Sequence, residues 1–232
     1  MRGVLVVGAS SPIGRAIGAA FAASGDRVRG VALESFVDRS FVDTLVLDCS
    51  TAVGAAAAVG SMESVDVVVL AAAAMPVGPV TSTTDEQWRT ALDATLGTAF
   101  AVCRAALPRM RDGGAIVAVS SVNAFLAAPG VPAYAAAKAG LEGLVRQLAL
   151  EYGPRGVRVN AVAPGMIGDP VDGAAAGYPL GRTGRPEEVA AAVHFLAGAG
   201  FVTDTVLPVD GGLSIASPAA FLRDDLRARW LP

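Results

Sequence analysis

The run Val4-Leu5-Val6-Val7, followed by Gly8-Ala9-Ser10-Ser11-Pro12-Ile13-Gly14, decides the fold of this 232-residue chain. A short apolar run that ends in a glycine-rich turn and continues into a helical pattern predicts a buried strand joined directly to a helix. At such a turn the backbone N–H groups and the helix N-terminus can face a pyrophosphate. The junction is therefore a candidate phosphate site, although the turn alone also suits a plain strand-to-helix connection.

Strand-like runs rich in Val, Ile and Leu alternate with helical patterns along the rest of the chain. The expected strands are 4–7, 28–33, 44–47, 67–70, 115–119, 158–161 and 205–208, and the expected helices are 13–23, 52–59, 85–110, 133–152 and 186–197. This alternation is typical of βαβ units around a parallel sheet. We expect an α/β, Rossmann-like, doubly wound fold with a seven-stranded parallel sheet and helices on both faces.

Local signals mark several helix ends. Thr84, with Gln87 three residues later, resembles a capping box, and Pro186 suits a first helical position. Gly113-Gly114 is expected to end the long helix 85–110.

Two segments interrupt the alternation. Residues 34–44 leave too little room for a full crossover helix, which predicts a loop or a single turn. Residues 165–182 are rich in Gly, Ala and Pro without periodicity, which predicts a mobile loop. Because no linker or repeat marks a boundary, we expect one dinucleotide-binding domain over 1–232, with a substrate loop at about 166–182 and a C-terminal extension at about 216–232.

Composition excludes several classes of partner. The net charge is −3 and the basic residues are dispersed, so a nucleic-acid partner is not expected. The longest apolar stretch, 65–79, is broken by Asp66 and is shorter than the roughly 18 residues of a membrane helix. No signal-peptide core is present at the N-terminus, so we expect a cytoplasmic protein without membrane association.

The cysteines and the single histidine offer no chemistry of their own. Cys49 and Cys103 have no CxxC neighbour and no His at metal spacing, which predicts reduced, buried thiols and no metal site. His194 lies within a helical pattern without a partner near it in sequence, and we interpret it as a packing or surface residue.

Tyr134 and Lys138 are four residues apart on a predicted helix and therefore project from one face. Ser121 ends the preceding strand, at the carboxyl edge where doubly wound sheets bind ligands. A tyrosine can exchange a proton with a hydroxyl group if positive charge draws its pKa, about 10 in water, toward neutrality. Lys138 and an oxidised nicotinamide would supply that charge, and Ser121 would orient a carbonyl oxygen.

The surrounding motifs make this pattern specific. They are GASSPIG from Gly8, two serines followed by YAAAK, RVNAVAPG from Arg158, GRTGRPEEVA from Gly181 and VDGGLS from Val209. Over nearly the whole chain, from Gly8 to about Ser214, the sequence resembles the short-chain dehydrogenase/reductase family, and in particular its smaller members similar to 3-oxoacyl carrier-protein reductases.

The resemblance implies an oxidoreductase that uses NAD(H) or NADP(H) and acts on the CH–OH group of a small-molecule secondary alcohol or on the matching ketone. Ser121 would orient the carbonyl, Tyr134 would be the acid/base, and Lys138 would contact both the nicotinamide ribose and Tyr134. The implied cofactor contacts are Gly8, Ser10, Ser11, Ile13, Gly14, Asp48, Cys49, Ala71, Ala72, Tyr134, Lys138, Pro164, Gly165 and Ile167.

Other positions concern the adenosine half of the cofactor. An acidic residue at the end of the second strand would bond a ribose 2′-hydroxyl, but Ala32 and Leu33 stand there. Glu34 and Arg15 are near but not decisive, so the preference between NAD and NADP stays open. Asp48 is a candidate adenine contact or, alternatively, the cap of the helix that follows it.

Several positions depart from the family pattern: Val7 and Pro12 in the first turn, Ala71 after the fourth strand, Thr95 in the long helix and Asp169 in the loop. In the family an Asn at the position of Thr95 supports a water-borne proton route to the lysine. A Thr hydroxyl can bond back to a helix carbonyl and so free an acceptor for water. We therefore include Thr95 among the catalytic residues.

The resemblance also implies a homodimer or homotetramer, because family members pair through the two helices expected at 85–110 and 133–152. A monomer with alanine-rich helices is the alternative. Near the C-terminus, Leu222, Leu226 and Trp230 form an apolar stripe that is expected to dock on a neighbouring subunit or beside the substrate loop.

Two functions are compatible with these residues. The first is an active dehydrogenase or reductase with the loop after Gly165 as a lid. The second is a dinucleotide-binding sensor or assembly subunit with little or no turnover, which Pro12, Ala71 and Thr95 would favour. The intact Ser121, Tyr134 and Lys138 favour the enzyme.

Overall fold

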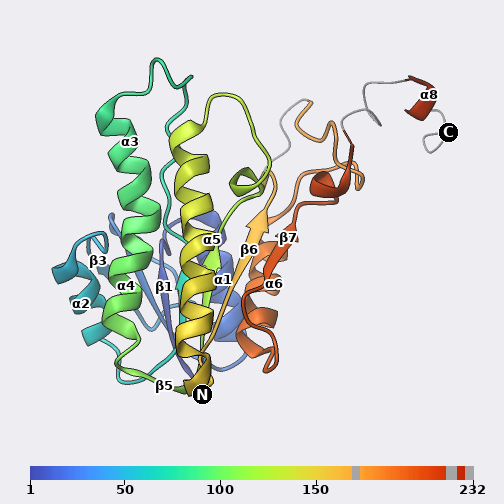
Figure 1. The fold of residues 1–232 in the computed structure, drawn as a ribbon. Helices are drawn as coiled ribbons and strands as arrows, with labels where there is room; N and C mark the ends of the chain where they lie inside the picture. Colours follow the sequence, from blue (N-terminus) through green and yellow to red (C-terminus); the bar gives the residue numbers. More distant parts are fainter. Residues whose placement is uncertain (169–172, 218–223, 228–232) are drawn as a thin grey trace.

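The computed structural model describes residues 1–168, 173–217 and 224–227 (Figure 1). Seven parallel strands form one sheet in the order β3-β2-β1-β4-β5-β6-β7. They are β1 (Gly3–Val7), β2 (Arg27–Ala32), β3 (Asp43–Val46), β4 (Val65–Leu70), β5 (Met110–Val119), β6 (Arg158–Pro164) and β7 (Val206–Val209). This confirms the predicted doubly wound fold. The strand order reverses between β1 and β4, where such sheets bind ligands at their carboxyl ends.

Helices cover both faces of the sheet. On one face, α1 (Pro12–Ala23) packs beside α6 (Pro186–Gly198). The other face carries α2 (Ala52–Gly60), α3 (Asp85–Leu92), α4 (Thr98–Ala106) and α5 (Pro132–Tyr152), as Figure 1 shows. The short helix α8 (Asp224–Arg227) stands apart from the sheet.

Alternation along each strand divides the apolar residues between two cores. In β1, Leu5 packs with residues of α2, α4 and α5, whereas Val4 and Val6 pack with residues of α1 and α6. Because both faces of the central strands are buried, these strands appear in the sequence as continuous apolar runs.

The helix predicted over 85–110 is wrong in two respects. It is interrupted by a π-helical segment, η1 (Asp93–Gly97), and it ends at Ala106 rather than at Gly113-Gly114. Pro108 has no backbone N–H, and Arg155 donates hydrogen bonds to the carbonyls of Leu107 (2.8 Å) and Met110 (2.6 Å). The chain then turns directly into β5.

Gly113 lies within β5 rather than at a helix end. Its φ of +82° is a conformation that glycine adopts easily, and the pairing of β4 with β5 shifts in register between Val65 and Val67. The two glycines therefore mark an irregular strand start.

Other local predictions are confirmed. The Thr84 hydroxyl accepts the N–H of Gln87 (3.1 Å), and the Gln87 side chain accepts the N–H of Thr84 (3.0 Å). Pro186 is the first residue of α6, and the chain between β2 and β3 contains no helix. His194 packs between α6 and α1, with Nε2 3.0 Å from Ser24 Oγ and its ring 5.0 Å from that of Phe21.

Both cysteines are buried and free. Burial raises the pKa of the Cys49 thiol to about 11 and that of Cys103 to about 12, which makes both poor nucleophiles. The described residues contain no cluster of three or more potential metal ligands. Within the same residues, no helix combines the length and apolar character needed to cross a bilayer.

Candidate active site

A crevice of about 540 Å³ opens at the carboxyl ends of β1, β2 and β4. It brings together half of the expected cofactor contacts: Gly8, Ser10, Ser11, Asp48, Cys49, Ala71 and Ala72. Its size and its position at the strand-order reversal suit the adenosine and phosphate parts of a dinucleotide. Ile13, Gly14, Pro164, Gly165 and Ile167 do not line it.

The glycine-rich turn is shaped for close backbone approach. Gly8 has a φ of +88°, and a Cβ there would lie 2.5 Å from the Ala72 nitrogen. A Cβ on Gly14 would lie 2.3 Å from the Gly8 carbonyl oxygen, so Gly14 lets α1 pack against the turn instead of lining the crevice. Only glycine fits at either position.

The turn leaves two N–H groups for an anion. Three other N–H groups of the turn are already bonded. The N–H groups of Gly8 and Ala9 bond to the Val31 carbonyl (2.9 and 3.0 Å), and the Ser11 hydroxyl, the N-cap of α1, accepts the N–H of Gly14 (3.0 Å). Among the described residues, the N–H groups of Ser10 and Ile13 have no partner. Pro12 begins α1, where no intrahelical donor is lost. The turn therefore fits a pyrophosphate.

Asp48 lines the crevice but does not cap α2. Its carboxylate accepts the N–H (2.9 Å) and hydroxyl (2.6 Å) of Ser50, whereas Thr51 is the N-cap and accepts the N–H of Gly54 (3.0 Å). The capping alternative for Asp48 was therefore wrong.

The end of β5 and the helix α5 bring Ser121, Tyr134 and Lys138 together. The Ser121 hydroxyl hydrogen-bonds the Tyr134 phenol. Lys138 Nζ donates to the Val119 carbonyl oxygen at 2.6 Å and lies 5.5 Å from the centre of the Tyr134 ring. The helical spacing and the strand end thus give the arrangement expected from the sequence.

The electrostatics differ from the expectation. Burial raises the pKa of Tyr134, and the hydrogen bond with Ser121 partly offsets that rise. Burial also lowers the pKa of Lys138 to about 7, against an opposing effect of Glu142. With its pKa lowered to about 7, Lys138 is already neutral at the pH where Tyr134 ionises in the cofactor-free protein, so burial decides the direction of the Tyr134 shift.

Lys138 is the only lysine among the 18 Lys and Arg residues of the chain. Its side chain is 2% exposed. A guanidinium group does not lose its proton in proteins, so Lys138 is the only one of these 18 side chains that can give up its proton. This compositional signal was present in the sequence and was missed.

Sequence reasoning also missed Ser120 and Glu142. The Ser120 hydroxyl donates to Glu142 Oε1 at 2.6 Å, directly behind the reaction centre. The only sequence signal is that Glu142 follows Lys138 by four residues, on the same helical face.

Thr95 lies in the π-helical segment η1, with its hydroxyl buried and without a partner in the described part of the chain. The expected back-bond from Thr95 is wrong: it is the Thr98 hydroxyl that bonds to the Asp93 carbonyl, at 3.0 Å. An orphaned polar atom at this depth costs about 1–3 kcal/mol unless water or a ligand satisfies it.

We expect Thr95→Asn to retain or raise turnover. An amide offers both a donor and an acceptor to water in the space where the Thr95 hydroxyl has no partner. Steady-state kinetics of the two proteins, with thermal unfolding as a check on folding, measures the effect. A large loss of kcat in a folded variant would contradict the assignment of Thr95 to the site.

Pro164 ends β6, and the chain that follows is fastened to β7 and to Tyr178. The N–H of Gly165 bonds to the Val209 carbonyl (3.1 Å), and the Tyr178 hydroxyl accepts the N–H of Met166 (2.7 Å). Ile167 bridges to Gly184. These contacts hold 164–167 at the carboxyl edge of the sheet. Asp169 lies outside the described residues.

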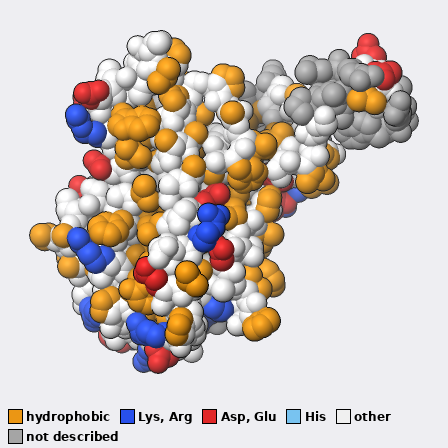
Figure 2. All heavy atoms as spheres, viewed as in Figure 1, with side chains coloured by type: hydrophobic (Ala, Val, Ile, Leu, Met, Phe, Trp, Pro, Cys, Tyr) orange, Lys and Arg blue, Asp and Glu red, His pale blue; other side chains and the backbone are white. Residues whose placement is uncertain are grey.

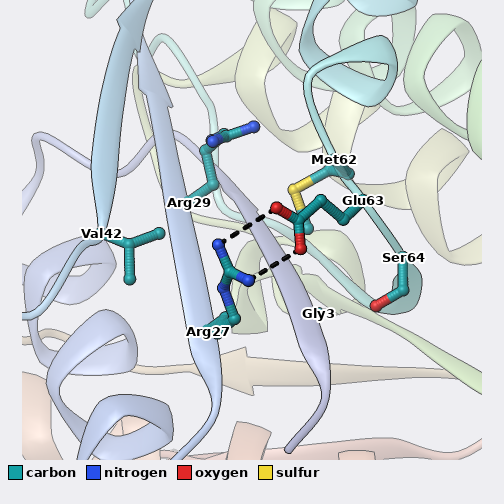
Figure 3. Close-up of a pocket in the computed structure, with 7 residues that line it drawn as sticks. All are labelled: Gly3, Arg27, Arg29, Val42, Met62, Glu63 and Ser64. Atoms are coloured by element: carbon teal, nitrogen blue, oxygen red, sulfur yellow. Dashed lines mark hydrogen bonds and ion pairs between the residues drawn. The ribbon is translucent and has the colours of Figure 1, made fainter.

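A second hollow lies at the opposite, amino-terminal edge of the sheet (Figure 3). It measures only about 40 Å³, and an ion pair of 2.7 Å between Arg27 and Glu63 crosses it. Ligand pockets usually measure about 300–1,000 Å³, so this hollow is not a candidate site.

Comparison with known proteins agrees with this geometry. A family model described as enoyl-(acyl carrier protein) reductase matches residues 8–214. An uncharacterised oxidoreductase of Schizosaccharomyces pombe is 36% identical, over 94% of this chain and 92% of its own. A 3-oxoacyl-[acyl-carrier-protein] reductase of Pseudomonas aeruginosa is 34% identical, over 90% and 96%.

A solved structure supports the same assignment. An oxidoreductase of the short-chain dehydrogenase/reductase family from Burkholderia thailandensis superimposes with a TM-score of 0.87 at 35% identity, covering 98% of this chain and 97% of its own. The chain therefore belongs to the short-chain dehydrogenase/reductase family of NAD(P)(H)-dependent oxidoreductases.

Proposed function

We propose that the protein interconverts a secondary alcohol and a ketone, with Tyr134 as the general acid/base. The observation that carries the proposal is the cluster at the carboxyl end of β5, where Ser121 hydrogen-bonds Tyr134 and Lys138 lies beneath the Tyr134 ring. A substrate oxygen placed between the two hydroxyl groups would contact both an orienting group and a proton donor.

A nicotinamide cofactor, when bound in the crevice, would supply or accept the hydride at the carbon that bears this oxygen. In the reducing direction, Tyr134 donates its proton to the developing alkoxide while Ser121 hydrogen-bonds the same oxygen. In the oxidising direction, Tyr134 takes the hydroxyl proton. A raised pKa of Tyr134 keeps the phenol protonated at neutral pH, which favours carbonyl reduction.

A dinucleotide-binding sensor with little turnover is the second candidate. The orphaned Thr95 hydroxyl favours it, since the expected proton route to Lys138 lacks its usual amide. The hydrogen-bonded Ser121 and Tyr134 favour the enzyme, because a protein that only binds cofactor does not need a poised acid/base.

We further propose a preference for NAD(H) over NADP(H). Arg15, the basic group near the position of a 2′-phosphate, is already engaged: it donates to the carbonyls of Ser10 and Val37 (both 3.0 Å) and lies 3.5 Å from Asp38. Glu34 lines the crevice, where its carboxylate can accept a ribose 2′-hydroxyl and would repel a phosphate.

This preference predicts that NADH binds at least about tenfold more tightly than NADPH, a difference of about 1.4 kcal/mol. Glu34→Gln should reduce the difference in affinity between NADH and NADPH, because it removes the repulsion between the carboxylate and a 2′-phosphate without changing the shape of the side chain. Glu86→Gln, an exposed glutamate that does not line the crevice, is the matched control. Fluorescence titration of both reduced cofactors measures the ratio, and equal or tighter binding of NADPH by the wild type would refute the preference.

We also propose that the protein forms a homodimer or homotetramer through the α3, α4 and α5 face. Figure 2 shows hydrophobic side chains gathered over this face. They include Trp88 (41% exposed), Phe100 (51%) and Leu150 (76%). Exposed large apolar side chains gathered on one face mark association sites. The expected docking stripe cannot be placed, since Leu222 and Trp230 lie outside the described residues.

The segment 166–182 is proposed as the substrate loop. The carrier-protein reductase relative suggests an acyl-type ketone, and the few charged residues of the loop favour an uncharged substrate.

The fluorescence titration of NADH and NADPH also tests whether the protein binds a nicotinamide cofactor at all. Micromolar binding of at least one reduced cofactor supports the proposal, and no binding of either contradicts it.

A further inference from the structure

Three consecutive residues at the end of β5 each hold a side chain of α5. The Val119 carbonyl accepts from Lys138 Nζ (2.6 Å), the Ser120 hydroxyl donates to Glu142 Oε1 (2.6 Å), and Ser121 bonds to Tyr134. Because Tyr134, Lys138 and Glu142 follow one another at intervals of four residues, they lie along one face of the helix. The helix face that carries Tyr134 and Lys138 therefore continues, one turn further on, with an acidic side chain.

We propose that Glu142, held in place by Ser120, is a positioning residue that keeps the Lys138 ammonium group charged in its buried site. The inference rests on the proposed function, since it concerns the lysine that supports Tyr134. Glu142 would act through Lys138 and not on the substrate, because it contacts neither the Tyr134 phenol nor the crevice.

The surroundings of Lys138 require such a partner. Its side chain is 2% exposed, and in the described part of the chain no carboxylate lies within 4.0 Å of Nζ. A buried ammonium group loses its proton unless an opposite charge is near. Burial lowers the pKa of Lys138, and among the described residues Glu142 is the charged group that opposes this effect.

The neighbours of Glu142 hold it in place and oppose the rise in its pKa that burial causes. Burial raises the pKa of Glu142, and the Ser120 hydrogen bond, Arg146 and Lys138 all lower it. Arg146 is exposed and lies 3.9 Å from Asp204, so its charge faces solvent. The elements α3 and η1 also pack on α5, but among the described residues they contribute no charge to either titration. Ser120, itself 2% exposed, therefore fixes the orientation of the carboxylate.

The consequence concerns where one proton resides. When Tyr134 and Lys138 together lose a single proton, the result is either a phenolate beside an ammonium or a phenol beside a neutral amine. Only the first form can accept a proton from an alcohol. Glu142 is one helical turn from Lys138 and two from Tyr134, so its charge favours the ammonium and with it the phenolate.

The protein offers a direct measurement, because Lys138 is its only lysine. Labelling with [¹⁵N, ¹³C]lysine gives one set of side-chain NMR signals, from which the protonation midpoint of Lys138 can be read in the folded protein. For Glu142→Gln we expect the midpoint to fall by about one pH unit. Ser120→Ala should give a smaller fall, and Glu142→Asp should restore part of the difference.

Glu151→Gln is the matched control, since Glu151 is an exposed glutamate on the same helix that is bonded to Gln147. It should leave the Lys138 midpoint unchanged. An unchanged midpoint in folded Glu142→Gln would overturn the proposal. If that variant does not fold, the Lys138 midpoint is measured in Ser120→Ala, which keeps Glu142 but removes the hydrogen bond that holds it. An unchanged midpoint in that variant would then overturn the proposal.

Kinetics provides a second, separate reading. In alcohol oxidation, Glu142→Gln should lower the kcat plateau by about tenfold with less than a twofold change in cofactor KM, since one pH unit corresponds to a tenfold shift in the proton equilibrium. An unchanged plateau, or equal changes in kcat and KM, counts against the proposal. If the wild type shows no turnover, the proposed function fails, whereas the Lys138 titration still decides whether Glu142 controls the lysine.

Discussion

Tyr134→Phe is expected to lower kcat for ketone reduction by about 10³-fold while cofactor affinity stays within about threefold of wild type. The phenol is the group placed to donate the proton, and general acid/base groups contribute about 10²–10⁴-fold. Removing one oxygen leaves the ring over Lys138 and does not touch the crevice at β1, β2 and β4. Single-turnover kinetics and a fluorescence titration measure the two quantities separately.

The matched control is Tyr178→Phe, which removes a second phenol, a buried one, close to the site. Its hydroxyl accepts the Met166 N–H and lies next to Gly165, so its loss should affect the loop and KM more than the chemical step. If Tyr134→Phe retains most of the wild-type kcat, Tyr134 is not the acid/base.

Lys138→Met is expected to lower kcat by about 10²–10³-fold and at the same time to stabilise the fold. The variant removes the ammonium group that supports Tyr134, and it replaces a buried ionisable side chain by an apolar one of similar length. Replacing buried charge by well-packed apolar groups often stabilises by about 1–4 kcal/mol. Here the gain is reduced by the loss of the 2.6 Å bond to Val119, so we expect about 1–2 kcal/mol.

The stabilisation should depend on pH with a defined sign. Burial lowers the pKa of Lys138 from 10.5 to about 7, so between these values the unfolded chain binds more protons than the folded one. The destabilisation by Lys138 is thus fully present below pH 7 and disappears as the pH rises toward 10.5. Thermal unfolding at pH 6 and pH 9.5 should show a larger gain at pH 6. A gain that grows with pH, or a destabilised variant at pH 6, would contradict this account.

The sequence was sufficient for the fold because the signals it used are local or repeated. Strands buried on both faces produce continuous apolar runs, and the turn after Val7 carries its own glycine requirements. Tyr134 and Lys138 share a helix, so their spacing alone places them on one face.

The features that sequence reasoning missed depend on contacts between distant segments. The end of α4 depends on Arg155, 48 residues beyond Leu107, and Arg15 is engaged by Val37, 22 residues along the chain. Ser120 and Glu142 meet only because β5 and α5 lie side by side. The raised pKa of Tyr134 was not expected because it depends on how deeply the folded chain buries the phenol and the Lys138 amine.

The most direct test of the central claim is the oxidation of reduced nicotinamide, followed by absorbance, when the protein and cofactor are mixed with a panel of ketones. We expect steady turnover with at least one uncharged ketone in the wild type and a loss of about 10³-fold in Tyr134→Phe under the same conditions. Cofactor binding without oxidation by any ketone, or equal rates in the two proteins, would contradict it.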